Sequence, residues 1–368
     1  MTTRHNAPLC RGGAAAAIAA LALIVVLAIG PSPADAARIN PAFKGQSMWI
    51  WNTPDTEAGN VAKIVARAKR AGLSAVYIKS ADGTNAWQQF TRPLVSTLHA
   101  AGLRVCGWQF VYGLRPAAEA RAAAAAKKAG ADCLIIDAES SYEGRYSPAR
   151  SYMKELRRLV GAKFPLGFTS FPYVDYHPSL PYSVFLGPGG AEVNMPQIYW
   201  RDIGDSVATS VKHTWRENRI YGRPIHPIGQ TYQSPSVADI LAFRRLAASY
   251  KAPGYSWWVW STTSEKIWTA LGRALPAISA PQDPGWPLLR SGAKGDSVVR
   301  AQQLLASAGA KKLKANGIFG AATVAAVKAF QATNKLTVDG HLGAATWAKL
   351  GKVTVALARD RAAGASVP

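Results

Sequence analysis

The chain alternates between short apolar runs and longer stretches whose apolar residues recur at helical spacing. Recurrence of that kind is typical of an amphipathic helix, whereas a short apolar run between polar residues is typical of a buried strand. Ala58–Ala71 shows the helical pattern, and Gly72 follows it as glycine commonly follows a helix. The pattern predicts eight strands, over Ser47–Asn52, Ala75–Lys79, Arg104–Phe110, Cys133–Glu139, Pro165–Ser170, Val193–Trp200, Pro224–Gln230 and Tyr255–Ser261.

Helices are expected between most of these strands. They are predicted over Ala58–Ala71, Asn85–Ala101, Pro116–Lys128, Ser147–Val160, Ser206–Asn218, Val237–Tyr250 and Glu265–Leu275. The fifth strand is followed instead by an irregular segment, Phe171–Gly190. Strands alternating with helices over residues 44–275 indicate an α/β fold, the (β/α)8 TIM barrel. The alternative is an open doubly wound sheet, which is disfavoured because no Gly-rich phosphate loop follows the first strand.

The fourth predicted strand, Cys133–Glu139, ends in two carboxylates, Asp137 and Glu139. Because side chains alternate across a strand, both acids point to the same side. Two acids at the end of an otherwise apolar strand are costly to place there without a use. They are therefore the leading catalytic candidates, at the barrel mouth where active sites of this fold lie. The alternative is an ion network that only orders the strand end.

Other polar and aromatic residues fall at predicted strand ends and could line the same mouth. The candidates for substrate binding are Trp51, Asn52, Lys79, Gln109, Gln197, Gln230 and Trp260, and Tyr199 is a third catalytic candidate. Lys79 could be a counter-ion of the two acids, or it could only satisfy a buried carboxylate. Tryptophan faces suit stacking on sugar rings, although Trp on a barrel strand is more often packing. The histidines show no paired ligand spacing, so neither a metal site nor a cofactor is expected.

Residues 1–36 resemble an export signal, with Arg4 and Arg11 before an apolar core, Ala14–Gly30, and a small-residue cleavage site. An uncleaved anchor is the alternative, because the core is at the short edge for a membrane span. No later stretch could span a bilayer. Cleavage would leave 41 Lys and Arg against 20 Asp and Glu, a net charge of +21. We therefore expect a secreted, monomeric protein associated with an anionic cell-wall polymer rather than nucleic acid.

The composition changes after a predicted linker, 276–287. Residues 288–350 are Ala/Lys-rich and helical, and they contain an internal echo in which Asn316-Gly and Asp339-Gly each set a turn before a helix. A disordered tail is expected over 351–368. The segment resembles the peptidoglycan-binding domain 1 family through Leu289-Arg-Ser-Gly-Ala-Lys-Gly-Asp-Ser-Val, Ala301-Gln-Gln-Leu-Leu, Asn316-Gly-Ile-Phe-Gly, Val327-Lys-Ala-Phe-Gln and Val338-Asp-Gly-His-Leu-Gly. The resemblance implies a three-helix module that tethers an enzyme to the wall.

The predicted barrel resembles two families of (β/α)8 glycoside hydrolases. Asp137-Ala-Glu139 is similar to the Asp-x-Glu of the family-25 muramidases, and the longer run from Asp132 to Glu139 is similar to the family-18 chitinase motif, with Ile135 in place of one Asp. Met195-Pro-Gln-Ile-Tyr199 resembles the chitinase Met-x-Tyr, and Trp258 or Trp260 resembles the chitinase floor tryptophan.

There are also departures from both families. The first strand ends in Trp51-Asn52 where the muramidases have Asp, and Trp200 follows Tyr199 where the chitinases have Asp. The resemblance implies an exported glycosidase acting on peptidoglycan or a related amino-sugar polymer. The alternative is a non-catalytic wall-binding protein on a degenerate barrel. Cys106 and Cys133 fall on neighbouring predicted strands, so a disulfide between them stays open.

Overall fold

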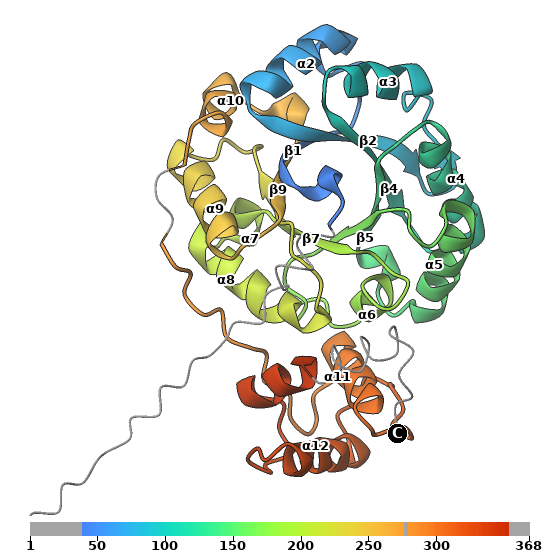
Figure 1. Cartoon of the computed structure of the whole chain (residues 1–368), viewed down its shortest axis with the longest axis vertical. Coiled ribbons are helices and arrows are strands. Elements are labelled where there is room, and N and C mark those ends of the chain that lie inside the picture. Colours follow the sequence, from blue (N-terminus) through green and yellow to red (C-terminus); the bar gives the residue numbers. More distant parts are fainter. Residues whose placement is uncertain (1–38, 276–278, 353–368) are drawn as a thin grey trace, which may run out of the picture.

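Eight parallel strands form a closed barrel in the computed structural model, which describes residues 39–275 and 279–352. The strands are β1 (Gly45–Ile50), β2 (Leu73–Asp82), β4 (Arg104–Val111), β5 (Cys133–Ala138), β6 (Leu166–Ser170), β7 (Val193–Ile198), β8 (Ile228–Gln230) and β9 (Gly254–Trp258). The sheet is closed because β1 pairs in parallel with both β2 and β9. Figure 1 looks along the barrel axis, with the helices in an outer ring. The predicted TIM barrel is confirmed.

The helices of the ring follow the strands in order. They are α2 (Val61–Arg70), α3 (Arg92–Ala100), α4 (Pro116–Lys128), α5 (Tyr146–Val160), α6 (Tyr182–Phe185), α7 (Trp200–Ile203), α8 (Val207–Asn218), α9 (Val237–Ser249) and α10 (Glu265–Leu271). The helix predicted from Asn85 begins later, because β3 (Asn85–Ala86) folds back on β2 and the Thr91 side chain caps the new start. The segment expected to be irregular contains the short helix α6.

The interior of the barrel is filled by side chains that alternate along the strands. Trp49, Tyr77 and Trp108 are buried there. The short 3-10 helix η1 (Pro41–Phe43) lies across the end where the strands begin, and the Tyr77 hydroxyl donates to the Ala42 carbonyl at 2.9 Å. With this end covered, a site in the barrel can open only where the strands finish.

A disulfide joins Cys106 on β4 to Cys133 on β5. The two residues are direct register partners on neighbouring strands, and their Cα atoms are 4.6 Å apart. Both cysteines are fully buried in the barrel interior. The question that the sequence left open is therefore answered by the strand register, which puts the two sulfur atoms on the same side of the sheet.

A small helical domain follows the barrel and contains α11 (Asp296–Ser307), α12 (Ala321–Thr333) and a third helix that begins at residue 344. The internal sequence repeat corresponds to a repeated hydrogen-bonding motif. Gln302 binds the Asn316-Gly turn, and Gln331 binds the Asp339-Gly turn. In each copy, the Gln carbonyl accepts from the turn glycine at 2.9 Å. The predicted helical domain after the barrel is confirmed.

The predicted leader, residues 1–36, lies outside the described residues, as does the predicted tail from residue 353 onward. Within the two described ranges, none of the helices combines the length and the hydrophobicity that crossing a bilayer requires.

Candidate active site

The two acids of β5 lie where the barrel opens. Asp137 ends the apolar part of the strand and is only 6% exposed, and Glu139 follows the strand and is partly exposed. Gln197 on β7 reaches both of them, because its Nε2 atom donates to Asp137 Oδ1 at 3.1 Å and to Glu139 Oε1 at 3.0 Å. One side-chain amide on β7 thus holds the two carboxylates of the β5 segment side by side.

Burial raises the pKa of Asp137 well above its ordinary value, and the charge of neighbouring Glu139 raises it further. The charge of Lys79 and the hydrogen bond from Gln197 oppose this rise without cancelling it. A carboxyl group in such surroundings retains its proton to higher pH than a solvated one. The pair can therefore carry a proton in the cleft, which is the electrostatic arrangement that acid catalysis by paired carboxyls uses.

Asp137 and Glu139 line a cleft with a volume of about 430 Å³. The residues that line it are Trp49, Asp137, Glu139, Phe171, Pro172, Gln197, Tyr199, Asp202, Ile203, Ile228, Tyr232 and Trp258. Burial raises the pKa of the Tyr199 hydroxyl well above its ordinary value, and the charge of Asp137 adds to that rise. Tyr199 is therefore a neutral hydrogen-bonding group beside the acids over the whole physiological range.

A third carboxylate, Asp202 on α7, also lines the cleft, and the sequence reasoning did not identify it. Tyr232 donates to one of its oxygens, and Gln233 donates to the other at 2.5 Å. The chitinase pattern places an Asp directly after the tyrosine, a position that Trp200 holds here while Asp202 follows two residues later. The short helix α7 turns the chain back and carries this acid into the cleft lining.

Lys79 does not pair directly with the acids of β5. Its Nζ atom binds Asp82 Oδ2 at 2.6 Å, and the residue is 3% exposed. The ammonium group lies 4.6 Å from the ring centre of Trp108 and 5.1 Å from that of Trp51, distances at which cation–π attraction operates. Trp51 is 49% exposed, and its ring centre lies 5.8 Å from that of Trp258, so it extends the aromatic surface beside the cleft.

Of the seven predicted substrate-binding residues, Gln197 lines the cleft and the other six do not. Gln109 is fully buried outside the barrel wall, where its amide donates to Glu119 on α4 and its carbonyl accepts from Tyr152 on α5. Its neighbours in the strand face inward, so the strand alternation turns Gln109 toward the helices. Gln230 is also fully buried, and it accepts from the backbone N–H of Arg201 at 2.7 Å.

Trp260 also lies outside the cleft lining. It is 3% exposed and packs on Trp268 of α10, with ring centres 4.7 Å apart. Trp258, two residues earlier, lies in the cleft lining instead. Asn52 is partly exposed near the mouth, but its side-chain amide is bonded to Asp55 at 2.5 Å.

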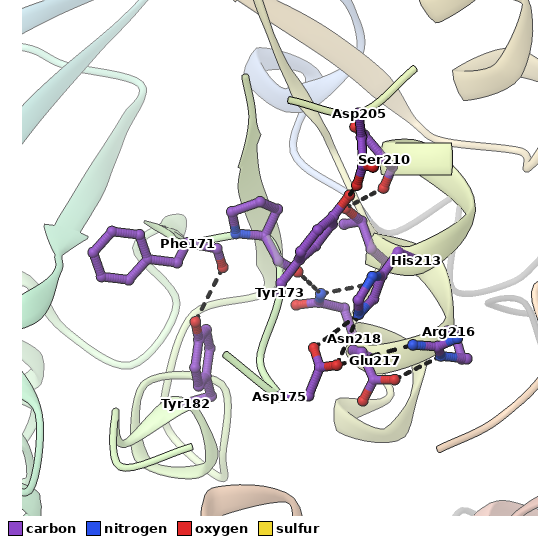
Figure 2. Close-up of polar contacts among 12 residues, drawn as sticks. Phe171, Tyr173, Asp175, Tyr182, Asp205, Ser210, His213, Arg216, Glu217 and Asn218 are labelled. Atoms are coloured by element: carbon purple, nitrogen blue, oxygen red, sulfur yellow. Dashed lines mark hydrogen bonds and ion pairs between the residues drawn. The ribbon is translucent and has the colours of Figure 1, made fainter. Parts of the chain in front are cut away.

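A second polar cluster lies outside the cleft, where the segment after β6 meets α8 (Figure 2). Asp175 accepts from the His213 ring at 2.8 Å, and Arg216 donates to Glu217 at 2.7 Å. The ligand atoms of Asp175, His213 and Glu217 all lie within 4.8 Å of one another. The guanidinium of Arg216 supplies the positive charge that two adjacent carboxylates need, so the cluster is an ion network that fixes this segment on α8.

The family described as "Putative peptidoglycan binding domain" matches residues 294–350, which confirms the resemblance of the C-terminal domain. A search of curated protein sequences gives no match to the chain.

Among solved structures, the chain is similar to a class V chitinase from Pseudomonas fluorescens Pf-5, with 11% identity, 62% of this chain and 98% of that chain covered, and a TM-score of 0.48. It is also similar to the spore cortex-lytic enzyme SleL of Bacillus cereus, with 13% identity, coverage of 62% and 73%, and a TM-score of 0.44. A third similar structure is domain 2 of a thermostable chitinase from Pyrococcus furiosus, with 13% identity, coverage of 64% and 94%, and a TM-score of 0.44. Likenesses at this level do not establish an activity for this chain.

Proposed function

We propose that the protein is an exported glycoside hydrolase of peptidoglycan or a related amino-sugar polymer, held on that polymer by its C-terminal domain. The observation that carries this proposal is the pair Asp137 and Glu139, joined by Gln197 in an open cleft. The match of residues 294–350 to a putative peptidoglycan binding domain supports the substrate class, because such a domain would bind the polymer that the cleft would cut. The leader over residues 1–36 and secretion are part of the same proposal.

Glu139 is the proposed proton donor, because it is the outer and more exposed member of the pair. In the first step, its proton passes to the glycosidic oxygen while the bond from that oxygen to the anomeric carbon breaks. The anomeric carbon then carries positive charge, which a carboxylate beneath it stabilises. A water molecule completes hydrolysis and returns a proton to Glu139.

Asp137 is the proposed partner of Glu139. Burial and the charge of Glu139 raise its pKa, so it retains a proton to higher pH than a solvated carboxyl does, and two such close acids share protons as a pair. In a substrate-assisted variant of the reaction, Asp137 and the Tyr199 hydroxyl would orient an acetamido group of the sugar. The cleft contains both groups, so this variant and direct stabilisation by Asp137 remain two versions of the same proposal.

The experiment is turnover of soluble amino-sugar oligomers by the purified full chain. We expect wild-type protein to release reducing ends, and Glu139→Gln to lose on the order of 100-fold or more of that rate, because the general acid is gone. Glu155→Gln is a matched control, since this glutamate pairs with Arg158 on α5 and does not line the cleft. A wild-type protein that cleaves no amino-sugar oligomer would contradict the proposal.

A further inference from the structure

The segment that follows β6 and includes α6, residues 171–185, lies between the cleft and the C-terminal domain. Its first two residues, Phe171 and Pro172, line the cleft. Its later residues, Pro178 and Ser183, contact the C-terminal domain. Figure 1 shows α11 of that domain next to α6. One short segment therefore touches both the candidate active site and the wall-binding domain.

On the cleft side, side chains from the barrel's outer layer bind the backbone of this segment. The Tyr182 hydroxyl donates to the Phe171 carbonyl at 3.0 Å (Figure 2), and the Asn218 amide donates to the Pro172 carbonyl at 2.8 Å. Tyr182 is the direct neighbour of Ser183, and Asn218 immediately precedes the 3-10 helix η4 (Arg219–Tyr221). The position of this cleft wall thus depends on where α6 lies and on where α8 ends and η4 begins.

On the other side, α6 and η4 are both bound by one buried carboxylate of the C-terminal domain. Asp296, at the start of α11, is fully buried, and its oxygens accept from the Ser183 N–H at 2.7 Å and from the Ser183 hydroxyl at 2.6 Å. The Tyr221 hydroxyl donates to Asp296 at 2.8 Å. In the reverse direction, the backbone N–H of Asp296 donates to the Pro178 carbonyl at 2.7 Å.

Arg300, one turn further along α11, adds contacts to the same part of the barrel. Its guanidinium donates to the carbonyl of Ile220 at 3.0 Å and to that of Tyr221 at 3.3 Å. Buried charged groups with several donors or acceptors satisfied fix one geometry, because any other leaves those groups unpaired. The C-terminal domain is therefore docked on the barrel through buried polar contacts.

We infer that the C-terminal domain is a positioning part of the candidate active site, holding the Phe171–Pro172 wall of the cleft through Asp296, α6 and η4. A domain of this kind does two things at once: it binds the wall polymer, and it keeps the cleft in its working shape. The consequence for turnover depends on the proposed function, whereas the bracing of the cleft wall does not.

The barrel also holds the segment by contacts of its own, and these give the competing explanation. The Tyr173 ring stacks on His213 with centres 3.8 Å apart, and the Tyr173 hydroxyl donates to Asp205 at 2.8 Å. If these contacts alone fixed the cleft wall, releasing the C-terminal domain would leave residues 171–177 unchanged. The two explanations therefore differ in a measurable way.

Hydrogen exchange on the full chain distinguishes them. In Asp296→Ala, the donors on Ser183 and Tyr221 lose their acceptor, and we expect amide exchange across residues 171–185 to quicken at least tenfold. Asp296→Asn keeps an oxygen for the Ser183 N–H and the Tyr221 hydroxyl, so it should restore most of the protection. Glu265→Ala is the matched control, because this exposed carboxylate also forms an ion pair, with Arg67 of α2, but is bonded to neither the segment nor η4.

Protection of the strand residues 133–138 in the same data shows whether the barrel itself is intact. One result would overturn the inference. In that result, Asp296→Ala speeds amide exchange at residues 219–221 and 296–300 but leaves exchange at residues 171–177 as slow as in wild type. If Asp296→Ala also speeds amide exchange at residues 133–138, the barrel itself is disturbed. The Arg300→Ala variant is then used in place of Asp296→Ala, with the same criteria.

On soluble oligomers, we expect Asp296→Ala to lower kcat/KM severalfold and Asp296→Asn to recover it. If wild-type protein proves inactive, the exchange data still decide whether the domain braces the cleft.

Discussion

The Nε2 atom of Gln197 lies 3.1 Å from Oδ1 of Asp137, although the two residues stand on different strands with β6 between them. Both side chains point into the barrel, so a contact that is remote in sequence forms across its mouth. The same amide reaches Glu139 at 3.0 Å. The geometry of the candidate acid pair therefore depends on an uncharged hydrogen-bond donor, the Gln197 amide.

Removal of that donor tests the arrangement. Gln197→Ala leaves two adjacent carboxyls without their shared hydrogen bond, and we expect kcat on soluble oligomers to fall on the order of 100-fold, as for loss of a positioned donor. Gln282→Ala, at an exposed position of the linker, should match wild type. An unchanged kcat in Gln197→Ala would show that the amide has no part in the reaction.

The raised pKa of Asp137 predicts a particular pH dependence of stability. Burial and the Glu139 charge make the folded protein bind this proton more tightly than the unfolded chain does, so stability falls as the pH rises from the unfolded pKa to the folded pKa. Asp137→Asn mimics the protonated form and lacks this loss. The free energy of unfolding of Asp137→Asn relative to wild type should therefore increase from pH 4 toward neutrality, by up to about 1.4 kcal/mol per pH unit in the titrating window.

Denaturant unfolding of both proteins at several pH values gives that difference directly. A difference that stays constant with pH, or that shrinks as the pH rises, would contradict the assigned direction of the Asp137 shift.

The disulfide predicts a stability contribution that is independent of the cleft. It closes a loop with a sequence separation of 27 residues. The chain-entropy model gives roughly 3–4 kcal/mol for a loop of this size. Cys106→Ala with Cys133→Ala should lower the free energy of unfolding by about that amount or somewhat more, because small cavities are also left in the packed interior. Denaturant midpoints measure it, and an unchanged midpoint would argue against a bridge in solution.

Asp202 is expected to contribute to binding more than to chemistry, since it lies in the cleft lining while Gln197 holds only Asp137 and Glu139. Asp202→Asn removes a charged acceptor that a sugar hydroxyl could use, and we expect KM for soluble oligomers to rise roughly fivefold to tenfold with little change in kcat. Asp239→Asn, in the first turn of α9 and outside the cleft lining, is the control. A large fall in kcat with KM unchanged would instead give Asp202 a role in the reacting step.

The periodicity of apolar residues was enough to predict the barrel strands and the side to which their side chains point. The alternation along Cys133–Glu139 gave the shared direction of Asp137 and Glu139, and the order of strands gave the barrel. The same alternation explains why Gln109, predicted to bind substrate, does not reach the cleft. It lies between the inward-facing Trp108 and Phe110, so its side chain faces the helices.

Other features depended on the path of the chain between strands, which no periodic pattern encodes. Asp202 reaches the cleft because α7 turns the chain back directly after β7. Trp258 rather than Trp260 reaches it because β9 ends before Trp260, which then packs on α10. Docking of Asp296 on Ser183 joins residues from two domains, and no signal within either domain indicates it.

The central claim is that the cleft cuts the polymer to which the C-terminal domain binds. The most direct measurement compares wild type and Glu139→Gln on the same purified peptidoglycan, with bound protein and released soluble sugar quantified side by side. We expect equal binding by both proteins, and release of reducing ends by wild type alone. Equal binding with no release by wild type, or equal release by both proteins, would contradict it.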